Sequence, residues 1–322
     1  MTTFGIHLTT FDAPQLSGDR LLPGLVEIAD VLESSPGFSA LWLADHMQDL
    51  RPGAAQAPMP EAYMTLAALA GRTTRLDLGV LATSVLYRSP ALLAKMVTTL
   101  DALSGGRAIL GIGAGHPRTE AEHRGYGVDF PTVPQRMALL DEALGTIRAM
   151  IGAEADPAAP PNWPRPARSG GIPLLVAGSG EQRLLRVAAR YADLINLSLP
   201  SGDSIDRIPH KLAVLAEHCR TVGRDPATIG VTYKGVLCVA DSPVAAGTIW
   251  DRWRQARGLP DELGSRHGVF VGEPSQIADQ LQPWLEPGIA HIVFELPNID
   301  DLEAVARAGQ LLGDLSGAVA LR

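Results

Sequence analysis

Two kinds of hydrophobic pattern alternate along the chain. Short runs rich in Val, Ile and Leu are followed by longer stretches in which apolar residues recur every three to four positions. The first pattern is typical of buried parallel strands and the second of helices packed against them. Strands are predicted at residues 4–8, 40–44, 76–82, 108–112, 173–177, 194–197, 229–239 and 290–296. Eight such strands favour a (β/α)8 barrel over a doubly wound open sheet.

The predicted helices have recognisable start and stop signals. Ser89-Pro90 supplies an N-cap and a proline at the first helical position, and Gly105-Gly106 ends the same helix. A second helix is predicted to carry one apolar stripe from Met137 to Ile151, and a third is predicted to begin at Gly180. These signals place helices between the predicted strands.

Three irregular stretches interrupt this alternation, at residues 113–133, 155–171 and 241–268. We interpret them as insertions in a single barrel domain that spans residues 1–322. The last of them contains a predicted extra helix with Trp250 and Trp253. The first follows a strand directly, so we expect it at the face where barrel enzymes keep their active sites.

Composition excludes several classes of protein. The formal net charge is -8, 46% of the residues are hydrophobic, and no Lys/Arg tract is present, which argues against disorder and against nucleic-acid binding. No leader pattern and no apolar run of membrane-spanning length are found, so we expect a soluble, cytoplasmic protein with no membrane partner. Cys219 and Cys238 form no CxxC pair and are interpreted as core residues.

Polar residues stand at the ends of four predicted strands. They are His7, Asp45-His46, and the segments 111–116 (GIGAGH) and 177–181 (AGSGE). In a barrel these positions converge on one mouth although they are far apart in sequence. Asp45-His46 could act as an acid/base pair, because histidine carries protons near neutral pH, or could be structural.

The two glycine-rich segments each have a functional and a structural interpretation. GIGAG lacks the following helix and acidic residue of a dinucleotide fingerprint, so it indicates either strand packing or close approach to a flat ring. Gly178-Ser179-Gly180 precedes a helix, where free N–H groups could bind a phosphate; the alternative is an ordinary serine N-cap with Glu181 in the first turn. A similar helix start occurs at residues 272–275.

The sequence lacks the motifs that would indicate a metal-dependent hydrolase, a serine hydrolase or a cysteine nucleophile. Metal-dependent barrel hydrolases often carry HxH on the first strand, but this chain reads His7-Leu8-Thr9, so no metal site is predicted. No GxSxG motif is present for a nucleophile-elbow hydrolase. His218 adjoins Cys219, but adjacent residues of a helix face different ways. The sequence therefore gives no support to a metal-dependent hydrolase, a nucleophile-elbow hydrolase or a Cys-His pair.

Several motifs together resemble a known family. The segments VLYRSPALLAK, LSGGRAILGIGAG and EAEHRGYG, all within residues 61–144, are similar to the luciferase-like flavin superfamily, and more narrowly to its branch that uses coenzyme F420, a deazaflavin. The similarity continues through PLLVAGSGEQRLLRVAARYAD and KLAVLAEHCRTVGRDPATI, so it covers nearly the whole chain. The resemblance implies a (β/α)8 barrel with the cofactor ring at the carboxyl mouth of the strands, and a homodimer.

The resemblance also assigns residues. Asp45 and His46 match paired residues near the reactive carbon, and an unusual cis peptide is implied at Leu81–Ala82. Cofactor contacts are implied at Leu81, Ala82, Ser84, Ala114, Gly115, Gly178, Ser179, Gly180 and Ser198.

One departure from the family bears on the substrate. Sugar-phosphate dehydrogenases of this branch have an acidic residue where this chain has His116, and their phosphate-binding lysines lack evident counterparts, because Lys211 and Lys234 fall in a predicted helix and strand. The sequence therefore predicts a substrate other than a sugar phosphate.

The resulting hypothesis is a coenzyme F420-dependent oxidoreductase that transfers a hydride to or from a small organic substrate. His46 would be the acid/base residue with Asp45 as its partner. His7 and His116 would line the pocket, and His116 is predicted to be a further catalytic residue that could donate a proton. One alternative is a monooxygenase of the same fold that uses reduced FMN and dioxygen. Another is a non-catalytic barrel that binds a ligand.

Overall fold

Eight parallel strands form a closed barrel in the computed structural model, which describes residues 2–16, 18–154, 156–197, 204–285 and 288–316. The barrel strands, in order, are β1 (Thr3–Leu8), β2 (Ala40–Leu43), β3 (Asp77–Val80), β5 (Ala108–Gly113), β6 (Leu174–Ala177), β7 (Leu194–Leu197), β8 (Gly230–Val239) and β10 (Ile289–Glu295). Strand β10 pairs with both β8 and β1, which closes the sheet and leaves these strands without a free edge. The predicted barrel is confirmed.

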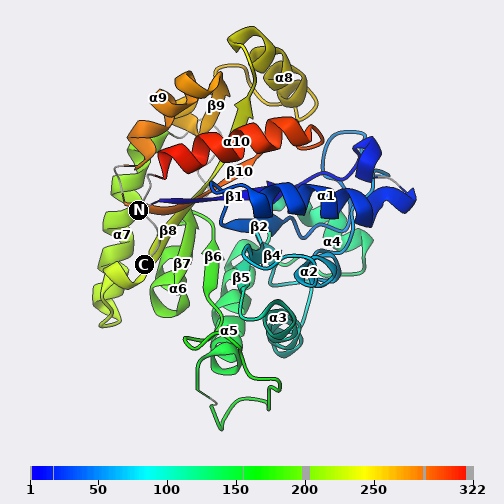
Figure 1. The fold of residues 1–322 in the computed structure, drawn as a ribbon. Helices are drawn as coiled ribbons and strands as arrows, with labels where there is room; N and C mark the ends of the chain where they lie inside the picture. The colour runs from blue at the N-terminus through cyan, green and yellow to red at the C-terminus, as the bar shows by residue number, and fades with distance from the viewer. Residues whose placement is uncertain (1, 17, 155, 198–203, 286–287, 317–322) are drawn as a thin grey trace.

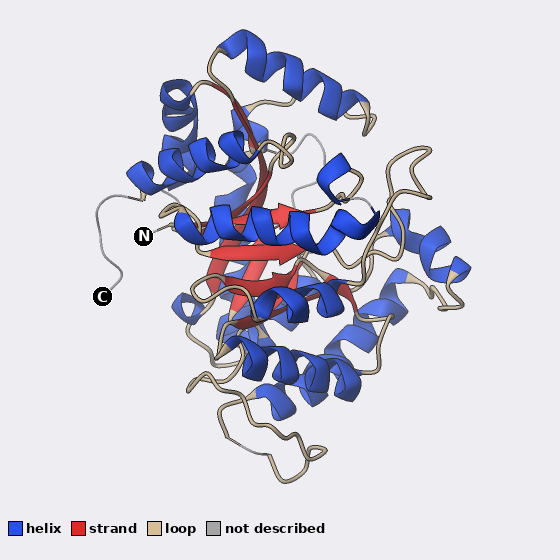
Figure 2. Ribbon diagram, turned by 45° about the vertical axis from the view of Figure 1, so that its right-hand side comes forward, coloured by secondary structure: helices blue, strands red, loops and turns tan. Residues whose placement is uncertain are grey.

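Helices surround the strands on the outside (Figure 2). They are α1 (Leu21–Ser34), α2 (Ala62–Ala70), α3 (Pro90–Ser104), α5 (Val133–Ile151), α6 (Leu184–Tyr191), α7 (Ile208–Thr221), α9 (Pro274–Leu285) and α10 (Leu302–Leu315). Helix α3 begins at the expected proline and ends at Gly105, whose φ of 69° is the left-handed conformation that favours glycine. The first and last helices, α1 and α10, pack side by side, which joins the two ends of the chain (Figure 1).

The eight predicted strands all form, with ends within two residues of the predicted ones. Two short strands were not predicted: β4 (Thr83–Ser84), which pairs with β5, and β9 (Val269–Gly272), which pairs with β8. The predicted strand at residues 76–82 stops at Val80, and the chain then passes through a cis peptide at Leu81–Ala82, as the resemblance implied.

Helix α6 begins at Leu184, not at Gly180 as predicted. Residues 181–183 form a turn, and the amide of Leu185 bonds to the carbonyl of Gly180. The backbone at Gly178 has φ 137°, which holds the loop away from helical geometry. The extended loop therefore remains available at the end of β6.

The three irregular stretches lie outside the alternation of barrel strands and helices. Residues 113–133 contain a 3-10 turn at Pro117–Thr119 and the short helix α4 (Glu120–Gly125), and the stretch 241–268 contains the expected extra helix α8 (Pro243–Gln255). Asn162 anchors the described part of the proline-rich loop, since its amide donates to Thr98 Oγ1 at 2.8 Å. Treating these stretches as insertions in one domain stays a prediction.

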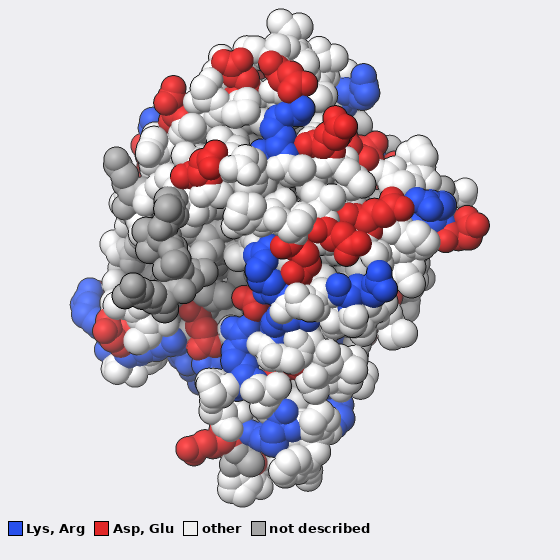
Figure 3. All heavy atoms as spheres, viewed as in Figure 1, with Lys and Arg blue, Asp and Glu red and all other residues white. Residues whose placement is uncertain are grey.

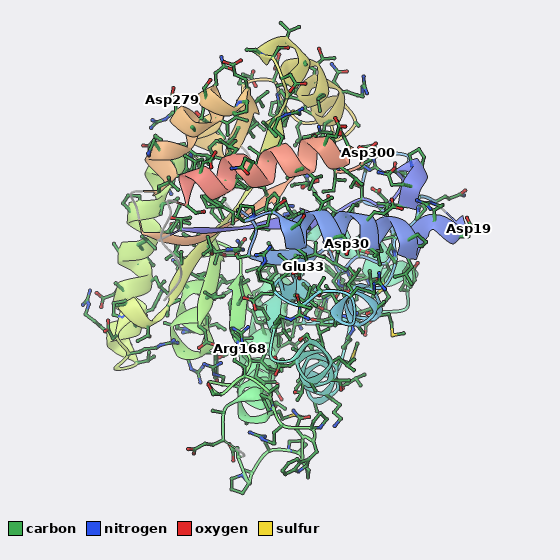
Figure 4. The ribbon with its side chains drawn as sticks, viewed as in Figure 1. Asp19, Asp30, Glu33, Arg168, Asp279 and Asp300 are labelled. Carbon is green, nitrogen blue, oxygen red and sulfur yellow. The ribbon has the colours of Figure 1, made fainter. Side chains whose placement is uncertain are left out.

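Hydrogen bonds from charged side chains hold the chain at the amino end of β3. Glu33 of α1 accepts hydrogen bonds from the backbone amides of residues 74–76 at 2.9 to 3.0 Å. Arg168 donates to Asp77 at the start of β3 over 2.6 Å. Both Glu33 and Arg168 are marked in Figure 4. These contacts fix the ends of the strands away from the predicted site.

A buried histidine is part of this amino end. His291 of β10 accepts a hydrogen bond from the indole N–H of Trp42 at 3.2 Å, and its other ring nitrogen bonds to Thr3 Oγ1 at 2.8 Å. Because an indole only donates, His291 is the neutral imidazole with its proton on Nδ1. Burial lowers the pKa of His291 to about 4, so the ring stays neutral in the folded protein.

Charged side chains of both signs are interleaved on the outer surface, as Figure 3 shows for one face, without a continuous basic tract on it. Within the part of the chain that the structure describes, no helix combines the length and the apolar character needed to cross a membrane. In the same residues, no group of three or more His, Cys, Asp and Glu side chains is placed to hold a metal ion.

Candidate functional site

Two adjoining cavities open at the carboxyl ends of the barrel strands. The larger has a volume of about 1050 Å³ and the smaller about 400 Å³, and His46, Leu81 and Lys234 line both. Three of the four predicted segments, from the ends of β2, β5 and β6, line the larger cavity, and His7 at the end of β1 lines the smaller. The predicted convergence on one mouth is therefore confirmed.

Asp45 does not bond to His46, so the predicted pairing of these two residues is wrong. The Asp45 carboxylate accepts hydrogen bonds from the hydroxyl of Thr83 and from both terminal nitrogens of Arg88, at 2.6 and 3.0 Å for the latter. Arg88 in turn bridges to Glu61. Asp45 thus ties β2 to β4 and to the start of α3 as part of a closed ion-pair network.

The partner of His46 is Glu122, from the insertion after β5. The distance from His46 Nδ1 to Glu122 Oε2 is 3.2 Å, and the Glu122 side chain is 0% exposed. Glu122 also accepts hydrogen bonds from the amides of Met47 and Gln48. Burial alone would raise the pKa of Glu122, but the bonds from His46 and these amides lower it. The ionised carboxylate fixes the proton of His46 on Nδ1 and leaves Nε2 as the acceptor.

Next to Glu122, His123 forms part of the wall of the larger cavity. Its Nδ1 bonds to the carbonyl of Thr119 at 2.7 Å, so Nε2 accepts from the hydroxyl of Ser84 at 2.9 Å. The ring stacks on Tyr87 with centroids 4.2 Å apart. Ser84, a predicted cofactor contact, is therefore held in a fixed orientation by the same insertion.

The glycines of GIGAG serve two purposes. A Cβ at Gly111 would lie 2.1 Å from the carbonyl oxygen of Val80, so this glycine allows β3 and β5 to pack closely. Gly115 has φ 76°, and a Cβ there would lie 3.2 Å from Ser84 Oγ at the cavity wall. The structural interpretation holds for Gly111, whereas Gly115, together with Ala114, lines the larger cavity.

The loop after β6 is not an ordinary helix cap. Ser179 makes no side-chain hydrogen bond to a described residue, and the residue before α6 is Arg183, which provides no side-chain cap. Lys211 of α7 donates to the carbonyl of Ser179 at 2.9 Å and to Glu181 at 2.7 Å. The alternative that Ser179 is the N-cap is therefore wrong, and the loop combines a free hydroxyl with a nearby ammonium group.

Arg136 adds a second basic group to the larger cavity. The residue is 4% exposed, its Nε donates to the carbonyl of Ala114 at 2.9 Å, and its guanidinium lies 4.0 Å from the centre of the Phe130 ring. It forms no ion pair with a described carboxylate. Sequence reasoning missed Arg136 and Glu122, although Glu122 stands in the quoted EAEHRGYG motif. It set Lys211 and Lys234 aside as residues of a helix and a strand, but both line the larger cavity.

His116 lines the larger cavity but is exposed and caps a short turn. Its Nδ1 accepts from the amide of Arg118 at 3.2 Å. Burial and then the charge of Arg118 lower the pKa of His116. Its predicted catalytic role stays a prediction, and Ser198, predicted to contact the cofactor, lies outside the described residues.

A closed parallel barrel with a large cavity beside a His–Glu pair defines an enzyme-like site at the carboxyl mouth. The chain belongs to the luciferase-like monooxygenase family, whose model matches residues 2–250. This confirms the resemblance drawn from the motifs.

Individual relatives cover most of the chain. It is 28% identical over 308 residues to "F420-dependent glucose-6-phosphate dehydrogenase 1" of Rhodococcus jostii, covering 86% of this chain and 89% of that protein. It is 26% identical over 332 residues to "4-hydroxyprotoasukamycin monooxygenase" of Streptomyces nodosus subsp. asukaensis, covering 90% and 85%. The structure of monooxygenase RslO1 from Streptomyces bottropensis superposes with a TM-score of 0.76 at 19% identity over 97% of this chain and 98% of that one, which shows a common fold.

Proposed function

We propose that the protein is an oxidoreductase that uses coenzyme F420 to transfer a hydride to or from a small organic substrate. The observation that carries this proposal is the His46–Glu122 pair at the point where the two cavities meet. The larger cavity has room for a cofactor and the smaller for a substrate. The 28% identity to an F420-dependent dehydrogenase over most of both chains supports the choice of cofactor.

The larger cavity suits a ligand with a flat ring and an anionic tail. Leu81, Ala82, Ala114 and Gly115 would flank the ring of the deazaflavin with little side-chain bulk, and Ser84 would contact it. The N–H of Gly178 already donates to the carbonyl of Asn196 at 2.9 Å, so the phosphate would be bound by the N–H groups of Ser179 and Gly180 and by the Ser179 hydroxyl, with the ammonium group of Lys211 close by.

The protein's own contribution to the reaction is proton transfer and positioning. When bound, the deazaflavin accepts or donates a hydride at its C5. During oxidation of an alcohol, Nε2 of His46 takes the hydroxyl proton, and during reduction of a carbonyl it returns that proton. Glu122 holds the imidazole by Nδ1 and stabilises its protonated form.

The second candidate is a monooxygenase that uses reduced FMN and dioxygen. The identity to 4-hydroxyprotoasukamycin monooxygenase favours it. The two candidates differ in the cofactor, because a deazaflavin lacks N5 and reacts poorly with dioxygen.

Titration of the purified protein with F420 and, separately, with FMN tests the proposal. Quenching of protein fluorescence should give a micromolar dissociation constant for F420 and much weaker binding of FMN. Binding of FMN without binding of F420 would reverse the choice. Binding of F420 without redox turnover over a broad substrate panel would favour the third possibility, a non-catalytic barrel.

The proposal includes a homodimer, as the resemblance to the superfamily implies, and a cytoplasmic location. Light scattering of the purified protein should give twice the chain mass of 34.1 kDa. A monomer at all concentrations would contradict the dimer, and fractionation of cells that express the protein would test the compartment.

A further inference from the structure

The smaller cavity carries an excess of positive charge. Its wall contains four basic side chains, Arg51, Arg118, Lys234 and Arg257, against two carboxylates, those of Asp49 and Glu295. The whole chain has the opposite balance, with a formal net charge of -8. A local field of this sign in a partly enclosed site favours an anionic ligand.

Most of the excess lies in one cluster formed by Lys234 of β8, Arg257 from the stretch after α8, and Glu295 at the end of β10. Lys234 Nζ lies 3.1 Å from Glu295 Oε2, and Arg257 Nη2 lies 3.2 Å from Glu295 Oε1. Although burial opposes ionisation, these two cations lower the pKa of Glu295 to about 2, so the carboxylate is charged. Two cations therefore share one carboxylate, and the cluster keeps one net positive charge.

His7 faces this cluster with both ring nitrogens unused. The residue is 4% exposed, and neither nitrogen has a hydrogen-bond partner among the described residues. Burial and then the charge of Lys234 lower the pKa of His7, so the ring is neutral and offers one donor and one acceptor. A buried polar group without a partner destabilises the fold, so this position indicates a polar ligand.

The other two arginines of the wall differ in their contacts. Arg51 is held by Asp49, with an Nη2–Oδ2 distance of 2.6 Å, and by Asp12 at 2.7 Å, so its charge is already balanced. The Arg118 guanidinium is exposed and makes no hydrogen bond or ion pair within the described part of the chain. The unbalanced charge is thus confined to the Lys234 cluster and to the Arg118 rim.

We propose that the smaller cavity binds a small organic monoanion: a hydroxy acid in the oxidation direction and the corresponding oxo acid in the reduction direction. The carboxylate binds beside Lys234 and Arg257 and accepts a hydrogen bond from His7. A dianion such as a phosphate monoester is disfavoured, because ionised Glu295 stands between the two cations. This inference rests on the proposed function and names its substrate class.

The reaction balances with the groups already named. The C–H bond of the carbinol carbon would break, and its electron pair would leave with the hydrogen as a hydride that bound F420 would accept at C5. The O–H proton goes to His46, and the C–O single bond becomes a carbonyl. The substrate is oxidised by two electrons, F420 is reduced by two electrons, and the carboxylate is unchanged.

Matched pairs of acids and amides test the inference. Lactate, 3-hydroxybutyrate and mandelate are compared with their primary amides and with glucose 6-phosphate, by following loss of F420 absorbance without oxygen. We expect kcat/KM for at least one acid to exceed that of its amide and of glucose 6-phosphate by tenfold or more. Faster turnover of the amides or of glucose 6-phosphate would overturn the inference, as would turnover of none of the compounds.

Variants separate this inference from the proposed function. Lys234→Met and Arg257→Met should each raise KM for the acid about tenfold, and Arg257→Met, whose residue lines only the smaller of the two cavities, should leave the F420 dissociation constant within a factor of two or three. Lys95→Met, at an exposed position of α3, is the matched control and should change neither. If both cavity variants bind F420 normally and keep the KM of the parent, the anion site alone is refuted. If the parent protein does not bind F420, the proposed function itself is refuted.

Discussion

Two buried histidines on neighbouring strands show how the two ends of the barrel differ. His291 of β10 lies at the amino end, next to Thr3 in the register of β1, and both its ring nitrogens are bonded within the protein. His7 of β1 lies one strand away at the carboxyl end, and neither ring nitrogen has a described partner. Burial lowers the pKa of both rings. The difference lies in the hydrogen bonds: one histidine completes the fold, and the other is left for a ligand.

Arginine side chains at the two ends differ in their hydrogen bonds in the same way. At the amino end, Arg107 donates to the carbonyls of Ser104 at 2.7 Å and Leu76 at 2.7 Å and to the hydroxyl of Thr73 at 2.9 Å. At the carboxyl mouth, the Arg118 guanidinium bonds to no described residue. Variants at the amino end should therefore change stability, and variants at the mouth should change turnover and binding.

The largest expected effect is at the mouth. His46→Ala should lower kcat by about a hundredfold to ten-thousandfold, because it removes the group that takes the substrate proton. The melting temperature and the F420 dissociation constant should stay near those of the parent. Steady-state kinetics and fluorescence titration measure both, and turnover at the parent rate with normal cofactor binding would remove His46 from the mechanism.

The second-largest expected effect is a loss of folding stability at low pH, caused by His291 at the amino end. The unfolded chain protonates His291 near its ordinary pKa of 6.5, whereas the folded chain resists protonation until about pH 4. Stability is therefore full above pH 6.5 and falls as the pH drops toward 4, by on the order of 3 kcal/mol from this residue. Urea unfolding between pH 7 and 4 measures the loss.

Two variants connect this prediction to the contrast between the ends. His291→Gln and His7→Gln should each flatten the dependence of unfolding free energy on pH, because glutamine does not titrate. Only His7→Gln should also raise KM for substrate. Equal effects of the two variants on KM, or an unchanged pH slope in His291→Gln, would show that the two ends are not distinct in the way described.

A smaller loss is expected for the partner of His46. Glu122→Gln should lower kcat by about tenfold to a hundredfold and leave the melting temperature and the F420 dissociation constant near those of the parent, because the imidazole of His46 loses the carboxylate that orients it. Glu120→Gln, on the exposed face of the same helix, is the matched control. A drop in melting temperature and in F420 affinity that accompanies the drop in kcat would indicate a purely structural role.

The smallest effect is expected at Ser179. Because its hydroxyl caps no helix in the protein, Ser179→Ala should leave the melting temperature unchanged and raise the F420 dissociation constant about threefold, the equivalent of losing one hydrogen bond of about 0.7 kcal/mol. Calorimetry and titration distinguish these two effects. A drop in melting temperature with unchanged F420 affinity would restore the N-cap interpretation.

The sequence predicts the barrel well because its strands are covered on both sides and appear as uninterrupted apolar runs. The sequence does not predict strand β4, because two residues are too few to show an alternation of hydrophobic and polar positions. It predicts too early a start for α6, because the turn after Gly180 keeps the helical spacing of apolar residues. Glycine motifs and His46 could be found from local pattern and family resemblance.

The contacts between these residues could not be found in the same way. Glu122 lies 76 residues from His46, and only the fold brings the insertion after β5 over the end of β2. Asp45 stands next to His46 in sequence, but adjacent residues at the end of a strand point in different directions, and Arg88 takes the carboxylate. Sequence proximity therefore suggested the wrong partner.

A crystal structure of the F420 complex tests the central claim most directly. The account predicts the phosphate at residues 178–180 and the ring beside Gly115, with a substrate atom able to sit about 3 to 3.5 Å from both C5 and His46. A ring bound elsewhere, with C5 remote from His46, would contradict it.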